Sequence, residues 1–506
     1  MPVQSFVMAL LLLLGTLGLP GGGAWAQSPP DALPLEVRSA LERAEVPREA
    51  LVAWVQEIAA GGRSSNGHDA APPRLIWQPD QPVNPASLAK LLTTYAALDL
   101  LGPAWTWDTP VWLQGPISRD GTLAGNLVIK GSGDPKLVLE RLWLLFRRLQ
   151  QFGVQRIAGD IVLDRSAFVV PEQNPGDFDG EPLRPYNVGA DALLLNYKAL
   201  QLTFMPDVAR GVAFIGVDPP LAGVRIDTSV PLAPPGGSSA CADWRSALGA
   251  QFADPARIRF AGTFNAACGE KSWPVAYIEP ATYNQRALLG LWTALGGALG
   301  GTVREGSAPA TPPSFVLSSP PLADVVRDIN KYSNNVMAQQ LFLTLGLLQR
   351  GSGTPENARA VLRQWVADRL GADVAAGLVI DNGSGLSRDT RVSGRLLARL
   401  LQSAWAAPVM PELVASLPVN GLDGTARRAG SPGVRAHLKT GSLRDVRGVA
   451  GEVLGDSGRR YVVVAILNHP NANRDAARAA LDALLRWAAD DGAVAASATG
   501  GAAANR

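Results

Sequence analysis

Residues 84–102 read NPASLAKLLTTYAALDLLG, a stretch that predicts a helix beginning at a serine. Gly102 and Pro103 end the pattern, and its apolar side chains recur at helical intervals at Leu88, Leu91, Leu92, Tyr95 and Leu98. Ser87 therefore lies at the start of the helix. Because residues three apart share one helix face, we expect the Lys90 amine to lie within contact of the Ser87 hydroxyl.

Lysine is rare in this chain, with seven residues against thirty-nine arginines, so its use at position 90 is informative. Burial, the positive end of the helix and a second cation nearby would all disfavour a charged Lys90 and lower its pKa. An arginine at this position would stay charged. A neutral amine beside Ser87 supplies the adjacent base that a nucleophilic serine requires.

Lys439-Thr440-Gly441 forms a second short motif, within VRAHLKTGS at 434–442. Two more apolar runs follow, VRGVAGEV at 446–453 and YVVVAILN at 461–468, with the turn-like GDSG between them. This pattern predicts an antiparallel meander that carries the motif on its first strand.

The chemistry of that strand suits an extended peptide that ends in a carboxylate. Lys439 supplies a fixed cation and Thr440 a hydroxyl, and Gly441 leaves the strand free of a side chain for backbone pairing. The backbone N–H groups of Ser87 and Ser442 are the candidates for an oxyanion hole.

Ser333-Asn334-Asn335 provides a Ser-x-Asn between the other two motifs. Ser64-Ser65-Asn66 also matches, but it lies in a polar loop ahead of Ser87, whereas Ser333 precedes an apolar-periodic helix. We assign Ser333 as the proton relay to the leaving group and Asn335 as the amide that holds the substrate carbonyl and Lys90 together. Alone, each motif is usually a solvated helix face, a strand end or a cap. Their order predicts acyl transfer through Ser87.

Other chemistries have no comparable support in the sequence. Gly-x-Ser-x-Gly and phosphate-binding loops are absent, and the three histidines, His68, His437 and His469, have no metal-ligand spacing. We therefore predict neither a cofactor nor a bound metal. The formal net charge is +2 with no basic run, which makes nucleic acid an improbable partner.

The chain ends and cysteines indicate an exported protein. Residues 1–26 contain VMALLLLLGTLGL followed by Ala-Trp-Ala, which predicts a cleaved signal peptide and a periplasmic location, with no transmembrane anchor after cleavage. Export favours a disulfide between Cys241 and Cys268, the alternative being two free buried thiols. Residues 491–506 are Ala/Gly-rich and predict a disordered tail.

The spacing of the motifs indicates a long insertion. Ser87 and Ser333 are separated by 246 positions, enough for one or two inserted domains. Short β-like runs broken by Gly, Pro and Asp predict a β-rich insert over 103–280. The helical stretch TYNQRALLGLWTALGGALGG then returns the chain to the catalytic domain, which we place at 27–102 and 281–490. The predicted class is α+β.

The chain resembles the low-molecular-mass class C penicillin-binding proteins, a family of exported D-alanyl-D-alanine carboxypeptidases/endopeptidases. The segments that carry the resemblance span nearly the whole mature chain: NPASLAKLLTTYAAL, GSGDPKL, YNQRALL, INKYSNNVMAQQL, IDNGSGLSRDTRVS, LPVNGLDGTARR and HLKTGSLRDVRGVAGEV. The resemblance implies a transpeptidase-like domain, with a five-stranded antiparallel sheet covered by helices. It implies that Ser87 is the acylated nucleophile and Lys90 its base. It also implies that Ser333-Asn334-Asn335 and Lys439-Thr440-Gly441 are the second and third motifs of the same active site.

The resemblance also implies peptidoglycan stem peptides as substrates and β-lactams as covalent inhibitors. Family members place an acidic residue and a downstream tyrosine of the insert near the substrate's diamino acid side chain. The stretch GDFDGEPLRPYNVGADAL offers Asp179, Glu181 and Tyr186, of which we select Glu181 and Tyr186, the alternative being a polar surface loop. A β-lactamase or esterase on the same fold, and a non-catalytic cell-wall-binding protein, are the rival interpretations.

Overall fold

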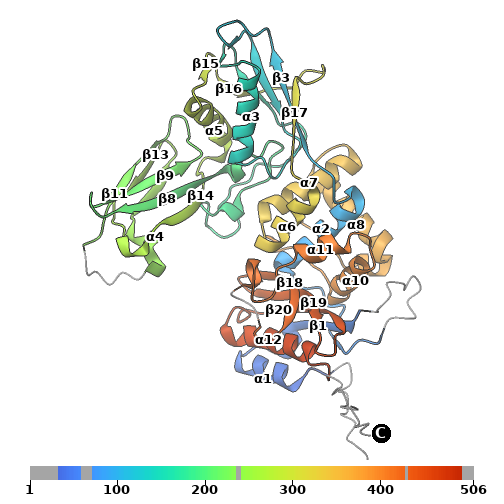
Figure 1. Cartoon of the computed structure of the whole chain (residues 1–506). Coiled ribbons are helices and arrows are strands. Elements are labelled where there is room, and N and C mark those ends of the chain that lie inside the picture. The colour runs from blue at the N-terminus through green and yellow to red at the C-terminus, as the bar shows by residue number, and fades with distance from the viewer. Residues whose placement is uncertain (1–31, 59–70, 235–240, 428–430, 493–506) are drawn as a thin grey trace, which may run out of the picture.

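The computed structural model describes residues 32–58, 71–234, 241–427 and 431–492. The chain forms two parts. The part that carries the three predicted motifs is called the catalytic part and is drawn at the bottom of Figure 1, and the insert lies above it. The predicted signal peptide at 1–26 lies outside the described residues. Within the described residues, no helix has the length and apolar character needed to cross a membrane.

A five-stranded antiparallel sheet forms the centre of the catalytic part, as predicted. Its strand order is β18 (Arg435–Leu443), β19 (Val446–Leu454), β20 (Arg460–Asn468), β1 (Leu51–Glu57) and β2 (Leu75–Trp77). The first three strands are the predicted meander, and β1 pairs with β20 along its whole length. The continuous apolar runs of these strands are explained by helices that cover both faces of the sheet.

One face of the sheet packs against the two terminal helices, α1 (Leu35–Arg43) and α12 (Asp475–Ala489). The other face packs against a larger group: α2 (Ala89–Leu101), α6 (Leu322–Tyr332), α7 (Asn335–Arg350), α8 (Pro355–Leu370), α9 (Ala372–Ala375), α10 (Gly394–Trp405) and α11 (Met410–Ser416). Helix α2 lies inside this group and is buried on all sides over its first ten residues. Most of its residues are apolar, which suits a helix inside a core, and α2 therefore carries Lys90 into the interior.

In the residues that the structure describes, the insert contains two larger sheets and two smaller ones. The sheet nearer the catalytic part in sequence has the order β16 (Val303–Glu305), β7 (Ile161–Asp164), β5 (Asn126–Lys130), β3 (Asp108–Gln114) and β17 (Phe315–Ser318). The second has the order β11 (Ser229–Pro231), β9 (Val212–Asp218), β8 (Ala199–Asp207) and β14 (Lys271–Ala276). The smaller sheets are β15 (Ala298–Leu299), β6 (Arg156–Ile157) and β4 (Thr122–Leu123), and β10 (Arg225–Ile226), β13 (Arg257–Phe260) and β12 (Ala250–Asp254).

The α-helices in the described part of the insert are α3 (Leu139–Gln151), α4 (Trp244–Ala247) and α5 (Pro280–Ala294). Side chains from both larger sheets join one continuous apolar cluster. A disulfide links Cys241 to Cys268 beside the second sheet.

The insert extends further along the chain than the sequence pattern indicated. Helix α5 was expected to open the second part of the catalytic domain, but its buried residues Tyr283, Leu288 and Trp292 lie in the core of the insert. Strands β16 and β17 follow α5 and pair with β7 and β3. The boundary expected at residue 281 is therefore wrong, and the chain returns to the catalytic part only at α6.

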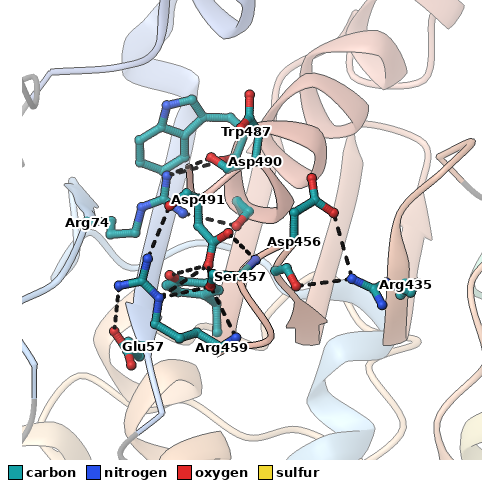
Figure 2. A network of polar contacts seen from close by, with 12 residues as sticks. Glu57, Arg74, Arg435, Asp456, Ser457, Arg459, Trp487, Asp490 and Asp491 are labelled. Atoms are coloured by element: carbon teal, nitrogen blue, oxygen red, sulfur yellow. Dashed lines mark hydrogen bonds and ion pairs between the residues drawn. The ribbon is translucent and has the colours of Figure 1, made fainter. Parts of the chain in front are cut away.

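Asp491, which was expected to begin a disordered tail, is instead held by contacts with the folded chain. The Asp491 carboxylate accepts hydrogen bonds from the Ser457 backbone N–H at 2.8 Å and from the Tyr461 hydroxyl at 3.0 Å, and Arg459 lies 3.4 Å from it. Figure 2 shows this network together with Arg74, which packs over Trp487 and bonds the carbonyl of Asp490. The end of α12 is thus fixed to the β19–β20 turn, while 493–506 lie outside the described residues.

Candidate active site

Ser87 lies in a 3₁₀ turn, η2 (Ala86–Leu88), that leads directly into α2. The residue before it, Ala86, has a φ of 47°, in the left-handed region that non-glycine residues seldom adopt. Gly385 packs against this turn so closely that a Cβ on it would lie 1.9 Å from the Ala86 carbonyl oxygen. Ser87 therefore lies in a turn that its neighbours hold in an uncommon conformation.

Lys90 makes three contacts from a completely buried position. Its Nζ lies 2.9 Å from Ser87 Oγ, 2.7 Å from Asn335 Oδ1 and 2.5 Å from the Ser384 carbonyl oxygen. Burial, and then the neighbouring charge of Lys439, hold the pKa of Lys90 well below its usual value.

The arrangement around Lys90 fixes the direction of its lone pair. A neutral amine has two N–H donors and one lone pair, and carbonyl oxygens can only accept hydrogen bonds. The two donors therefore go to Asn335 Oδ1 and the Ser384 carbonyl, and the lone pair remains for the Ser87 hydroxyl. The orientation of the Asn335 amide is set independently, because its Nδ2 donates to the Tyr186 carbonyl at 3.3 Å.

Lys439 joins the second motif to the third. Its Nζ donates to Ser333 Oγ at 2.9 Å and to the Thr440 carbonyl at 2.8 Å. Ser333 lies between α6 and α7 in the left-handed conformation, with a φ of 55°. Burial lowers the pKa of Lys439 to about 7. The structure thus brings all three predicted motifs together around one site.

Strand β18 lies at the edge of its sheet and contacts the η2 turn that carries Ser87. The Leu438 N–H points outward, since it bonds the carbonyl of Pro418. Alternate residues of a strand point their N–H groups to the same side, so the N–H groups of Thr440 and Ser442 also face outward. A Cβ on Gly441 would lie 2.8 Å from the Pro85 carbonyl oxygen, which explains why the strand carries glycine at its approach to the serine turn.

A cleft of about 720 Å³ opens above these groups and is lined by both parts of the molecule. The catalytic part contributes Ser87, Ser333 and Ser442, and the insert contributes a loop over 177–186. Charged side chains of both signs line the cleft: Asp177, Asp179, Arg388 and Arg444. The guanidinium of Arg388 also packs over the Phe178 ring at 4.8 Å.

The acidic partner of Tyr186 is Asp179 and not Glu181, which corrects the sequence-based choice. Asp179 accepts a hydrogen bond from the Tyr186 hydroxyl at 2.9 Å and from Asn187 Nδ2 at 2.7 Å. Burial acts to raise the pKa of Asp179, but these hydrogen bonds hold it below its usual value. Glu181 lies outside the cleft lining and pairs with Arg184 at 3.4 Å.

Thr425 was not identified from the sequence as a neighbour of the Lys439-Thr440-Gly441 motif. Its hydroxyl oxygen lies 2.7 Å from that of Thr440. The loop that carries it is tied to α6 by an ion pair of 2.6 Å between Lys331 and Asp423. The stretch LPVNGLDGTARR contributed to the resemblance, but nothing in its pattern indicated that this threonine reaches β18. Among the described residues, no three His, Cys, Asp or Glu side chains are grouped so that they could hold a metal ion.

The sequence model of the D-Ala-D-Ala carboxypeptidase 3 (S13) family matches residues 68–490. The chain belongs to this family. This chain is 29% identical to the D-alanyl-D-alanine carboxypeptidase of Actinomadura sp. (strain R39) over 401 residues, which cover 74% of this chain and 71% of that relative. It is 25% identical to D-alanyl-D-alanine carboxypeptidase DacB of Haemophilus influenzae over 394 residues, 76% of this chain and 80% of that one.

The fold comparison agrees with the family. The crystal structure of penicillin binding protein 4 (dacB) from Haemophilus influenzae superposes with a TM-score of 0.69 at 21% identity, covering 90% of this chain and 100% of that one. The same protein complexed with a β-lactam gives a TM-score of 0.65. These findings confirm the predicted family and the predicted α+β class, and family membership makes the S13 peptidase a D-Ala-D-Ala carboxypeptidase.

Proposed function

We propose that this peptidase removes the terminal D-alanine of peptidoglycan stem peptides through an acyl-enzyme on Ser87, and that it also cleaves cross-links between stems. The observation that carries the proposal is the 2.9 Å contact between Lys90 Nζ and Ser87 Oγ. Since both other partners of the amine accept hydrogen bonds, its lone pair is directed at the serine.

The first step forms the acyl-enzyme. Lys90 takes the proton of the Ser87 hydroxyl, and Oγ attacks the carbonyl carbon of the penultimate D-alanine. The N–H groups of Ser87 and Ser442 donate to the oxyanion of the tetrahedral intermediate. When the intermediate collapses, the C–N bond breaks and the proton reaches the leaving nitrogen through the Ser333 hydroxyl.

The second step is hydrolysis of the ester. Lys90, neutral again, takes a proton from a water molecule, whose oxygen attacks the ester carbonyl. The bond between Ser87 Oγ and the carbonyl carbon then breaks, Lys90 returns the proton to Oγ, and the shortened stem leaves with a carboxylate. In a cross-linked substrate the leaving amine belongs to another stem, so the same groups perform the endopeptidase reaction. Asn335 holds the substrate carbonyl and Lys90 together throughout.

Substrate recognition rests on two groups of polar and charged side chains, one on β18 and one in the lining of the cleft. Protonated Lys439 and the Thr440 hydroxyl bind the terminal carboxylate beside the edge of β18. Asp179, held by Tyr186, and Arg388 carry opposite charges in the cleft lining. They match the ammonium and carboxylate groups of a diamino acid side chain.

The proposed location is the periplasm, after removal of residues 1–26. The apolar run in this segment and the Ala-Trp-Ala before Gln27 support export. Amino-terminal sequencing of the protein secreted by a bacterial host tests this directly. A mature chain that starts at Gln27 is the expected result, and retention of Met1 would contradict export by cleavage.

The experiment that tests the activity is digestion of a mixture of peptidoglycan fragments, with Ser87→Ala as the matched control. We expect free D-alanine from pentapeptide stems and conversion of cross-linked dimers to monomers by the wild type alone. Release of D-alanine without loss of dimers would leave a carboxypeptidase and remove the endopeptidase proposal. Intact fragments together with rapid hydrolysis of penicillin would show a β-lactamase instead.

A further inference from the structure

A second groove, of about 460 Å³, adjoins the catalytic cleft on the side of the insert. Tyr186, Tyr332, Ser333 and Asn335 line both hollows, so the groove continues from the cleft across the second motif. Its far wall comes from β8 and β14 of the insert. Apart from the residues that it shares with the cleft, the groove has no role in the proposed reaction at Ser87.

The groove differs from the cleft in charge. Among the described residues that line the groove there is no Asp, Glu, Lys, Arg or His. The cleft, in contrast, is lined by two acidic and two basic side chains. Stem peptides carry carboxylates and an ammonium group, and burying such charges without partners is costly. The groove therefore suits an uncharged part of the substrate.

Tyrosines and amides supply the chemistry of this groove. The side chains of Tyr186 and Tyr332 remain 41% and 65% exposed, which leaves ring surface open to a ligand. In the described part of the chain, no hydrogen bond involves the Tyr332 hydroxyl, the Gln201 amide or the Nδ2 of Asn334. Aromatic faces that take apolar C–H surfaces, together with a few free donors and acceptors, are typical of a small-ligand site.

One wall of the groove is built from an uncommon backbone. Asn196, Tyr197 and Lys198 are three consecutive residues with φ values of 43°, 54° and 46°. The turn is held by the Asn196 side chain, which accepts from the Leu139 N–H at 3.1 Å and donates to the Ala199 carbonyl at 3.0 Å. Left-handed non-glycine residues persist where surrounding contacts enforce them, and they cluster at ligand sites.

We propose that this groove binds the glycan backbone of peptidoglycan, a chain of uncharged N-acetylated hexosamines. Their C–H faces pack on the tyrosine rings, and their hydroxyl and acetamido groups bond the free amides. About four residues separate the glycan from the scissile bond, roughly 13 Å of extended chain. The sugar therefore belongs beside the cleft rather than at the nucleophile. This inference rests on the proposed action on peptidoglycan stems.

The test compares two substrates that share one stem, a disaccharide pentapeptide and the same pentapeptide without sugar. For the wild type we expect kcat/KM to be about tenfold higher for the sugar-bearing substrate. Gln201→Ala reduces that preference about fivefold, and Thr203→Ala, two residues along the same face of β8 but outside the groove, retains it. Tyr332→Leu, which removes a ring and keeps apolar bulk, also reduces the preference. Calorimetry with a peptide-free tetramer of N-acetylglucosamine supplies a readout that is independent of catalysis.

Equal kcat/KM for the two substrates would overturn the inference, and so would a preference that Gln201→Ala leaves unchanged. A preference for sugar-free cross-linked stems over sugar-free single stems, lost in Gln201→Ala, would assign the groove to a second peptide. Acylation by penicillin is measured on every variant. If acylation persists without a sugar preference, the groove is wrongly assigned; if acylation fails in the wild type, the proposed function itself is wrong.

Discussion

The hydroxyl oxygens of Thr425 and Thr440 lie 2.7 Å apart. In the structure the Thr440 hydroxyl donates to the Thr425 hydroxyl. Each hydroxyl carries one donor, so when Thr440 donates to a substrate carboxylate instead, the bond between the two threonines can be kept only with Thr425 as its donor. Under the proposed function, Thr425 is thus a positioning residue for the substrate carboxylate. Thr425→Val removes the donor and keeps the shape, and we expect kcat/KM for substrates with a free terminal carboxylate to fall about tenfold, the effect of about one lost hydrogen bond.

The control for this prediction is the substrate with a terminal carboxamide. Thr425→Val should leave kcat/KM for this substrate nearly unchanged. Thr425→Ser should have the wild-type kcat/KM for the substrate with a free terminal carboxylate. An equal loss on both substrates would show that Thr425 only supports the loop.

Replacement of Lys90 tests the base. Lys90→Arg keeps a cation in place but cannot accept a proton near neutral pH, so we expect the rate of acylation by penicillin to fall about 10²–10⁴-fold. Because arginine is larger and this site is completely buried, Lys90→Gln provides a second, uncharged variant, and thermal melting shows whether each one folds. A folded arginine variant that acylates at the wild-type rate would refute the role of Lys90.

The two buried lysines predict a bell-shaped pH profile for kcat/KM. As pH falls, Lys90 gains a proton through its lowered pKa and can no longer act as base. As pH rises through about 7, Lys439 loses the charge that binds the carboxylate. A bound carboxylate raises the pKa of Lys439, so the alkaline limb of kcat should lie at higher pH than that of kcat/KM. Coincident alkaline limbs would contradict the role given to Lys439.

Glu452 predicts a dependence of stability on pH that is separate from catalysis. The side chain is 3% exposed, its Oε2 has no hydrogen-bond partner, and burial raises its pKa to about 7 from 4.5. At pH values between 4.5 and about 7, Glu452 holds its proton in the folded state but not in the unfolded state. The free energy of unfolding therefore falls as pH rises through this range. We expect Glu452→Gln to raise the free energy of unfolding at pH 8 by on the order of 2 kcal/mol and to change little at pH 4.

Glu36→Gln, at an exposed position on α1, is the matched control for this measurement. It should leave the unfolding free energy unchanged at both pH values. Equal stability of Glu452→Gln and the wild type at pH 8 would show that the buried carboxyl carries no such cost.

The spacing of apolar residues along the sequence predicted the helix that follows Ser87 and the strands of the meander. The helical spacing of the apolar residues after Ser87 placed Ser87 and Lys90 about one turn apart, and the meander pattern placed Lys439 on its first strand. The helix α5 was assigned to the wrong part because an apolar stripe shows that a helix packs, but not on which neighbour. Asp179 was passed over for Glu181 because a loop with several carboxylates has no period, and only the contact with Tyr186 selects one.

The most direct test of the central claim is the site of acylation by penicillin. After incubation and digestion with a protease, mass spectrometry should find one stable penicilloyl group on the peptide that contains Ser87, and none on any peptide of Ser87→Ala. An adduct on another residue, or no adduct on the folded wild type, would contradict the account.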